Sequence, residues 1–428
     1  MRRRSLLASP LFAATLLLGA PAGATEPSNQ SQLPDAKSFG TTPARAQGYA
    51  PAASPIAVDE ETQFARPPYR TSEYAPIATD PPGDWYVLHA GLRPQLGTFG
   101  GVASFALAHA RTERWYGGFS LSAIRNDAGT HAGVAQIALG RNLSDDFAGG
   151  VQLSLTENRA RSFAGLGQTT LAYNRAGQMV GVTQLAGYNR AHTFDGLAQL
   201  GLYNRTDKRF DGVADVGVFN HAQGDFNGLV QLGVVNATGE KVFGEDHFGA
   251  KSHFAGLAQI GVVSTSNGHF YGLAQLGATT FTSGDFRGVA QLAFLGAGAG
   301  NFAGLAQGGL VAVSKESTGM QIGAGAIAFE EHTGLQLGAL ATYAKSVDGA
   351  QIGVANLGEK VRGVQIGVFN HARSLRGVQI GLANHADDGV LPWTALLNMG
   401  FGDDGEDRER DDEYQRMKGA RAGASNRF

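Results

Sequence analysis

The chain has 428 residues, with 62 glycines, 14 prolines, no cysteine and a formal net charge of −3. The missing cysteine excludes disulfides, thiolate metal sites and a cysteine nucleophile. The small net charge gives no general electrostatic case for binding nucleic acid, and we predict no nucleic-acid partner.

Residues 1–24 have the three parts of a secretory signal peptide. Three arginines follow Met1, an apolar run extends from Leu11 to Leu18, and AGA (22–24) fits a small-residue cleavage site. The apolar run is too short to cross a bilayer as a helix. We therefore predict a signal peptide over 1–24 and export of a chain that starts near Thr25.

The rest of the chain divides into three segments by composition. Residues 25–83 are rich in Pro, Ala, Ser, Thr and Gln without a sustained period, which predicts a flexible linker. An apolar-rich region begins near Trp85 and lasts to Phe401, so a β-repeat domain is predicted over 84–402. Residues 403–428 mix opposite charges closely, and we predict a solvated, disordered tail there.

A short unit with Gln at its centre recurs through the predicted domain. Its central residues are Gln136, Gln152, Gln168, Gln184, Gln199, Asp215, Gln231, Gln259, Gln275, Gln291, Gln307, Gln321, Gln336, Gln351, Gln365 and Gln379. The spacing is nearly constant, apart from one step of double length between Gln231 and Gln259. A repeat of about 14–16 residues means that one structural unit is reused along the chain.

Each unit alternates two kinds of residue. In GVQIGVFN (363–370), Val and Ile fall on one face of an extended chain, and Gly, Gln and Phe fall on the other. A period of two with β-branched residues predicts strands, whereas a helix would place Gln and Val on one face. Earlier units such as GLAQLGLYN (196–204) have one extra residue before the central Gln. The candidate inward-facing polar positions are Gln199, Asp215, Gln231, Gln259, Gln275, Gln365 and Gln379.

Polar segments that contain Gly separate the units. HAQGD (221–225), TSNGH (265–269) and TSGD (282–285) have the composition of hairpin turns. We therefore predict an all-β domain of about 18–20 strands, each about 8–11 residues long.

A closed antiparallel β-barrel of the outer-membrane type is the leading prediction for these strands. A unit such as Phe194 to Tyr203 has about the length of a tilted strand that crosses a bilayer, ~9–11 residues. Aromatic residues at both ends of the units fit interfacial girdles. They are Phe163, Phe194, Phe210, Phe226, Phe254, Phe270, Phe286 and Phe302 at the start, and Tyr173, Tyr188, Tyr203 and Phe219 at the other end. WTALLNMGF (393–401) resembles the terminal strand of such barrels, although a charged segment follows it.

A parallel β-solenoid, in which each repeat forms one coil, is the alternative. The spacing of the repeats is nearly uniform, whereas outer-membrane barrels alternate short turns with long loops. Gln residues that stack from coil to coil would form a ladder. However, segments between units, such as RTDKR (205–209), are charged and short, which disfavours the second strand that a coil needs.

The units GVQIGVFN (363–370) and GVQIGLAN (377–384) resemble a bacterial surface-repeat family with tandem G-x-Q-I-G-x-x-N units behind a signal peptide. The resemblance covers roughly residues 130–400 and is strongest after Gly319. It implies placement at the cell surface or outer membrane. It implies no activity, because the family is grouped by its repeat.

The sequence contains no H-E-x-x-H, G-x-S-x-G, P-loop or dinucleotide motif, so we predict no enzyme activity and no cofactor. Asn-His-Ala triples at 220–222, 370–372 and 384–386 could bring two histidines together if repeats stack. Exposed histidines are ordinary at turns, however, and no metal site is predicted. Asp215, which replaces Gln in the series, could select cations if it lined a pore, or it is a neutral substitution.

The insertion ATGEKVFGEDHFGAKSH (237–253) is the long loop within the repeats. Long loops on a rigid scaffold often carry binding, so we predict a partner contact there, with a tolerated surface insertion as the alternative.

The leading functional hypothesis is a non-enzymatic outer-membrane β-barrel that is structural, adhesive or passively porin-like. Its partners would be outer-membrane lipid and an unknown surface ligand. The alternative is an exported β-solenoid adhesin or surface-coat protein. Both place the chain at the outer membrane or cell surface of a Gram-negative-type bacterium.

Overall fold

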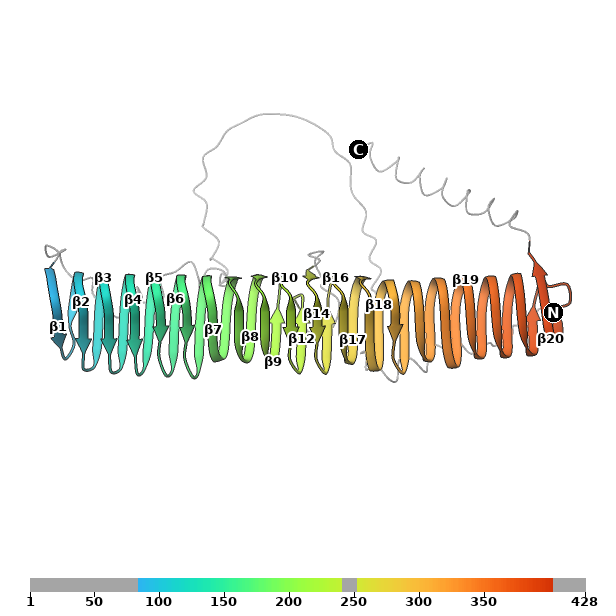
Figure 1. Cartoon of the computed structure of the whole chain (residues 1–428), viewed down its shortest axis with the longest axis horizontal. Helices are drawn as coiled ribbons and strands as arrows, with labels where there is room; N and C mark the ends of the chain where they lie inside the picture. The colour runs from blue at the N-terminus through green and yellow to red at the C-terminus, as the bar shows by residue number, and fades with distance from the viewer. Residues whose placement is uncertain (1–83, 241–251, 403–428) are drawn as a thin grey trace, which may run out of the picture. The chain divides into compact units, whose positions relative to one another are not determined.

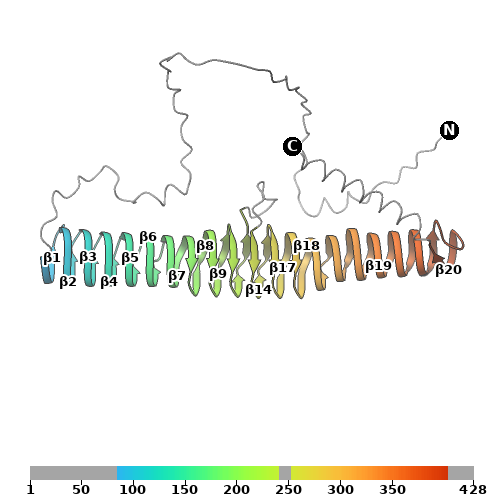
Figure 2. The same cartoon turned by 90° about the horizontal axis from the view of Figure 1, so that it is seen from above.

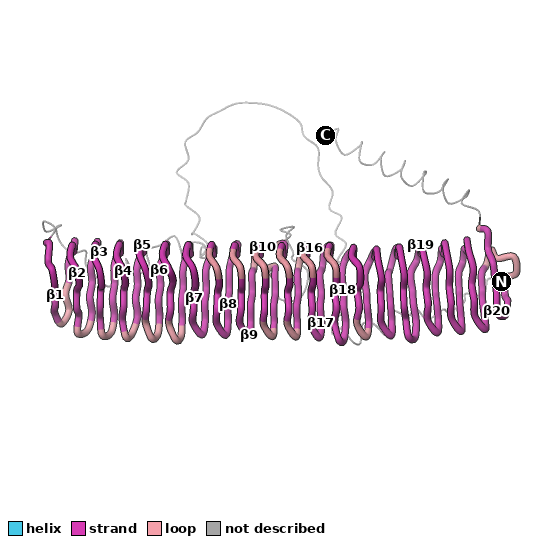
Figure 3. Tube along the Cα trace, in the orientation of Figure 1, coloured by secondary structure: helices cyan, strands magenta, loops and turns pink. Residues whose placement is uncertain are grey.

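The computed structural model describes residues 84–240 and 252–402. The predicted signal peptide 1–24, linker 25–83 and tail 403–428 lie outside these residues. Nearly all of the described chain is strand, with short loops at the corners (Figure 3). In these residues no helix is long and apolar enough to cross a membrane.

The described residues form 20 strands. Their bounds are β1 (Asp84–Gly91), β2 (Gln95–Ala106), β3 (His109–Ser122), β4 (Arg125–Ala138), β5 (Arg141–Leu153), β6 (Glu157–Thr169), β7 (Tyr173–Asp195), β8 (Ala198–Asp211), β9 (Ala214–Ala222), β10 (Asp225–Asn227), β11 (Val230–Leu232), β12 (Val235–Thr238), β13 (His253–Ala255), β14 (Ala258–Ile260), β15 (Val263–Ser266), β16 (His269–Tyr271), β17 (Ala274–Arg287), β18 (Ala290–Gly308), β19 (Val311–Ala386) and β20 (Trp393–Phe401).

Each repeat forms one coil of a parallel β-solenoid, and the coils stack along one axis (Figures 1 and 2). The strands from β1 to β19 pair in parallel with their counterparts one coil away. Gln136 pairs with Gln152, Gln184 with Gln199, and Gln307 with Gln321. The sequence separations of these three pairs are 16, 15 and 14, so the coils differ slightly in length. β19 is continuous over 76 residues because its strand conformation passes through several corners.

The predicted closed antiparallel barrel is therefore wrong, together with its membrane-crossing strands and porin-like lumen. The parallel β-solenoid is the alternative that the structure confirms. Repeated sequences explain the outcome, because parallel stacking places each residue beside its own equivalent in the next unit. Antiparallel neighbours would instead place the start of one unit beside the end of the next.

The segments that were predicted as turns between membrane strands form the second side of each coil. RTDKR (205–209) lies inside β8, where Thr206 is 2% exposed and the residues on either side of it point outward. HAQGD (221–225) contains the end of β9 and the start of β10, so it is a corner within a coil. Inward and outward side chains continue to alternate through these charged segments, and the segments can therefore form strands.

A column of aromatic rings runs through the interior of the first coils. Neighbouring ring centroids are 4.3 to 5.6 Å apart and their planes are nearly parallel. The column consists of Phe99, Trp115, His131, Phe147, Phe163, Phe194, Phe210, Phe226, Phe254, Phe270, Phe286 and Phe302, with Met179 in the place of a ring between Phe163 and Phe194. The eight phenylalanines predicted as the girdle at the start of the units are thus at most 2% exposed and belong to the core, whereas Phe219, Tyr173, Tyr188 and Tyr203 at the other end are half-buried.

Two columns of amide side chains run parallel to the aromatic column. From Gln152 to Gln379, each Gln Nε2 donates to the Oε1 of the preceding Gln at 2.7 to 2.9 Å, except around Asp215. The second column joins Asn side chains at 2.7 to 3.1 Å over Asn142–Asn236 and Asn356–Asn384. Buried amides must be hydrogen-bonded, and this stacking provides a partner for each of them.

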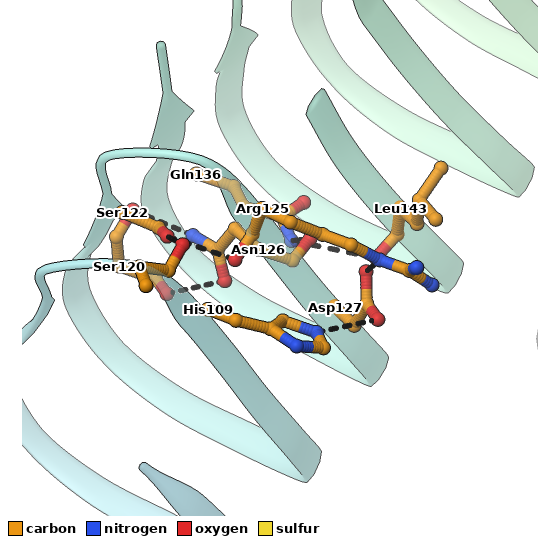
Figure 4. A network of polar contacts seen from close by, with 9 residues as sticks. His109, Ser120, Ser122, Arg125, Asn126, Asp127, Gln136 and Leu143 are labelled. Atoms are coloured by element: carbon orange, nitrogen blue, oxygen red, sulfur yellow. Dashed lines mark hydrogen bonds and ion pairs between the residues drawn. The ribbon is translucent and has the colours of Figure 1, made fainter. Parts of the chain in front are cut away.

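At the N-terminal end of the Gln column, shorter side chains take the same place (Figure 4). Ser120 pairs in register with Gln136, and its hydroxyl donates to Asn126 Oδ1 at 3.0 Å. Gln136 Nε2 donates to the carbonyl oxygen of Asn126 at 3.1 Å. Beside these bonds, Arg125 Nε donates to Asp127 Oδ1 at 2.6 Å, in an ion pair whose Asp127 side chain is buried.

The coils after Phe302 turn more tightly at one corner. In the longer coils, this corner has a Gly followed by an exposed aliphatic residue such as Leu197 or Leu305. In the coils after Phe302, it has a single Gly with a φ of +119° to +147°. These glycines are Gly319, Gly334, Gly349, Gly363 and Gly377. Glycine adopts this left-handed conformation without the steric cost that a Cβ would impose.

β20 covers the C-terminal end of the stack and is antiparallel to the last coil of β19. Asn398 Nδ2 donates to Gln379 Oε1 at 3.2 Å and so ends the Gln column. The resemblance of WTALLNMGF to a barrel-closing strand is therefore not a sign of a barrel. Residues alternate along β20 because one face of the strand covers the core of the solenoid. Asn398 and Gly400 are turned to the core, and Trp393 and Phe401 are exposed.

His131 provides a test of the aromatic column. It is fully buried between Trp115 and Phe147, and in the described residues neither ring nitrogen has a hydrogen-bond partner. Burial lowers the pKa of His131 from 6.5 to about 3. The unfolded chain therefore gains a proton below pH 6.5 that the folded chain does not, so stability is lost as the pH falls from 6.5 towards 3.

We expect His131→Phe to stabilise the protein, and to do so by about 3 kcal/mol more at pH 4 than at pH 7.5. Urea denaturation at the two pH values measures this difference. An equal gain at both values would contradict a neutral, buried imidazole.

Candidate binding face

The outer side of each coil between the aromatic column and the Asn column is aliphatic. Its side chains form three columns, which we call the aliphatic face. The first contains Val182, Leu197, Val213, Leu229, Leu257 and Leu273; the second contains Leu185, Leu200, Val216, Leu232 and Ile260; the third contains Leu171, Leu202, Val218, Val234 and Val262, with Gly187 in the coil between Leu171 and Leu202. Leu202 is 67% exposed and Val218 50%. A contiguous exposed apolar surface that continues from coil to coil is typical of an interaction site.

A groove lies between the second and third aliphatic columns, and its floor consists of glycine. A Cβ on Gly201 would lie 2.4 Å from the carbonyl oxygen of Ala186 and 2.8 Å from Asn189 Nδ2, so the floor has no room for a side chain. The groove has a volume of about 510 Å³ between Leu185 and Val234. A second stretch of about 750 Å³ lies between Ile322 and Leu396.

A column of stacked tyrosines borders the first stretch of the groove. Ring centroids are 4.9 Å apart between Tyr173 and Tyr188 and 4.8 Å apart between Tyr188 and Tyr203. Phe219 continues the stack at 4.8 Å from Tyr203. Burial and the neighbouring tyrosines raise the pKa of Tyr188. We call these four residues the tyrosine column, and all four are half-buried on the outer side.

An arginine column follows the tyrosine column two residues further along the strands. It consists of Arg159, Arg175, Arg190 and Arg205 on four successive coils. Asp207 Oδ2 lies 3.0 Å from Arg190, and Asp207 Oδ1 lies 2.8 Å from Arg205. Burial lowers the pKa of the Arg175 guanidinium, and the charges of Arg159 and Arg190 lower it further. Positive charge is therefore concentrated along this column.

The Gln positions that the sequence marked as inward-facing lie inside the solenoid. Gln199, Gln231, Gln259, Gln275, Gln365 and Gln379 are 0% exposed, and each takes part in the Gln column. They line no lumen, because the core columns fill the coil.

Asp215 occupies the Gln position in its coil and interrupts the column. Gln231 Nε2 donates to Asp215 Oδ2 at 3.4 Å, while Oδ1 has no hydrogen-bond partner in the described residues. Gln199 Oε1 accepts from the Thr206 hydroxyl at 3.1 Å and so has a partner other than Asp215. Burial raises the pKa of Asp215 from 3.8 to about 7, against the opposing effect of hydrogen bonds from Gln231 and Asn204. The proposed cation selection at a pore has no basis in this geometry.

Two of the three Asn-His-Ala triples do meet. His371 and His385 stack at 5.0 Å, with their Nδ1 atoms 2.9 Å apart, and Trp393 packs 4.3 Å from His385. Burial and His385 lower the pKa of His371. Among residues 84–240 and 252–402, no group of three or more His, Asp or Glu side chains is placed to hold a metal ion.

The coils on either side of the insertion that was predicted as a partner contact stack directly on each other. Gln231 pairs directly with Gln259 across the long step in the repeat, and Val235 pairs with Val263. Residues 241–251 lie outside the described part of the chain, and the predicted contact stays a prediction.

The groove and the two outer columns were not identified from the sequence. The signal was present as Tyr-Asn-Arg at 173–175, 188–190 and 203–205. In a strand the central Asn points to the core while Tyr and Arg share the outer side, so equal register in stacked coils places like residues together. The sequence assigned Gly201 and its equivalents to the crowded inner side of the strand. Their backbone also forms the floor of the groove on the outer side.

Comparison with protein-family models, with curated proteins and with solved structures finds no match. The resemblance to the bacterial surface-repeat family stays a prediction.

Replacement of Asp215 by Asn tests the interruption of the Gln column. The folded state keeps a proton on Asp215 that the unfolded chain releases between pH 4 and 7, so wild-type stability falls as the pH rises through this range. Asn has the same shape and adds an N–H donor. We expect Asp215→Asn to stabilise the protein by about 4 kcal/mol more at pH 8 than at pH 4.

Chemical denaturation at the two pH values measures this effect. Asp225→Asn is the matched control, because the Asp225 side chain is 45% exposed. A gain for Asp215→Asn that does not change with pH would contradict a buried carboxyl with a raised pKa.

Proposed function

We propose that this chain is an exported, non-enzymatic β-solenoid that adheres to a surface through its aliphatic face, as an adhesin or coat protein. The observation that carries the proposal is the continuity of that face across coils. Each coil adds ~4.8 Å of length, so the aliphatic columns extend for tens of ångströms. A scaffold of this kind repeats a weak apolar contact many times, and repeated contacts add to a strong attachment.

The fold suits such a role because its surface is held rigidly from inside. Amide and aromatic columns fix each coil against the next, so outward residues remain in straight rows. The signal-like segment 1–24 and the resemblance to surface-repeat proteins support placement outside the cytoplasm. Of the predicted outer-membrane location, we propose only placement at the cell surface, without strands in the membrane.

Lysine substitutions on the face test the proposal. Leu202→Lys, Val218→Lys and Val234→Lys are combined in one variant, since these side chains are 47% to 67% exposed in the wild type. We expect about tenfold less of this variant to remain attached to cells of a Gram-negative host that exports it, because three apolar contacts are lost. The measurement compares cell-bound and released protein, with protease treatment of intact cells to establish exposure.

A matched variant carries Gln178→Lys, Asn227→Lys and Thr318→Lys, which are exposed residues outside the aliphatic face. It should stay attached as the wild type does. Equal attachment of both variants, or protection of the wild-type protein inside the cell, would refute adhesion through the aliphatic face.

A further inference from the structure

Three surface features occur together on the coils between Glu157 and Val234. They are the first stretch of the groove, the tyrosine column and the arginine column. Within β8, the order along the chain is Leu202, Tyr203, Asn204 and Arg205, with Asn204 turned to the core. The outer surface therefore changes within a few residues from aliphatic to aromatic to cationic. The second stretch of the groove, from Ile322 to Leu396, has no comparable arginine column among the residues described beside it.

The stacked rings limit what the tyrosine column can bind. Tyr188 and Tyr203 each have a ring against both faces, at 4.8 to 4.9 Å. A sugar or a base that stacks on an aromatic ring needs a free face, and these two rings expose edges. Edges with hydroxyl groups suit the boundary between hydrocarbon and water, where tyrosines are enriched.

The charge on this flank is positive. Four arginines there oppose two carboxylates: Arg159, Arg175, Arg190 and Arg205 against Glu157 and Asp207. On the flank beyond the aromatic column in the neighbouring coils, Arg209 lies between Asp195 and Asp211, and Asp225 follows. The two flanks thus differ in sign, and a negatively charged surface would attract the arginine side.

We propose that the coils from Glu157 to Val234 dock peripherally on an anionic phospholipid surface, with the groove against the acyl chains and the tyrosine and arginine columns at headgroup level. The inference deepens the proposed function and rests on it, because it assigns the adhering surface a lipid partner. Apolar residues supply contact area, and arginines bind phosphate through paired N–H donors. No strand crosses the bilayer in this arrangement.

Flotation of the purified full chain with vesicles tests the proposal. Vesicles of phosphatidylcholine alone are compared with vesicles that also contain phosphatidylglycerol. We expect about tenfold more protein to float with the anionic vesicles, and this excess to fall as the salt concentration rises, because each arginine near the surface adds a screened attraction. Equal flotation with both vesicles, or an excess that salt does not reduce, would overturn the proposal.

Two variants locate the contact. Arg159→Gln with Arg175→Gln should remove most of the anionic excess, and Leu202→Ser with Val218→Ser should reduce flotation with both vesicles. Arg287→Gln with Arg373→Gln is the matched control and should float as the wild type does, because these arginines are 64% and 69% exposed and lie outside the arginine column. Wild-type flotation of the first variant would overturn the assignment of headgroup contacts to Arg159 and Arg175. The salt series on the wild type decides the proposal even if a variant fails to fold.

Other occupants of the groove give different results. A dimer of the chain alone that Leu202→Ser with Val218→Ser converts to monomer would assign the groove to a second copy and overturn the lipid partner. Binding of glycerophosphate by the wild type, with no flotation on either vesicle, would assign the arginines to a free phosphate and also overturn the lipid partner. If the lysine variant loses cell attachment while no vesicle binds the wild type, the lipid inference fails and adhesion through the aliphatic face stands.

Discussion

The hydrogen bond between one buried Gln amide and the next is the interaction on which the rest of the structure depends. A buried amide needs both a donor and an acceptor at its own depth in the core. The equivalent residue one coil away provides both, at 2.7 to 2.9 Å along the column. This requirement selects parallel, in-register stacking and excludes a slip of one residue, which would move every Gln to the outside.

In-register stacking also determines the surface. A residue that recurs in the sequence recurs at one place on every coil, so leucines become a ridge and the glycines at equivalents of position 201 become the floor of a groove. The Tyr-Asn-Arg repeats show both effects in one short motif, because Asn204 joins the core column while Tyr203 and Arg205 extend the outer ones. Core and candidate site therefore arise from one pattern.

The sequence allowed prediction of strands, of the repeat and of Gln on the inward face, because a period of two is visible in any pairing of strands. It did not decide between barrel and solenoid, because both place alternate residues on opposite faces. The wrong choice came from RTDKR (205–209), where four charged residues suggested a turn although Thr206 lies in the core. Phe194 and its equivalents were placed at a membrane boundary for a similar reason. The period of the repeat does not show which part of the chain packs against each phenylalanine.

The coils after Phe302 show which interior column defines the fold. The aromatic column ends there: Ser317 follows Phe302 in register and bonds to His332, and Val347, Val361 and Leu375 form the later core. The sequence separation between stacked Gln residues falls from 16 to 14, and one corner becomes a single left-handed glycine. The Gln column passes through this change without a gap, from Gln291 through Gln307 to Gln321. Ring stacking is therefore one of several ways to fill the coil, whereas the Gln amides are the feature that long and short coils share. A repeat of this kind can change length and lose its aromatic residues and still join the stack, provided that a polar side chain, such as Gln or in single coils Ser120 or Asp215, remains in register at the Gln position.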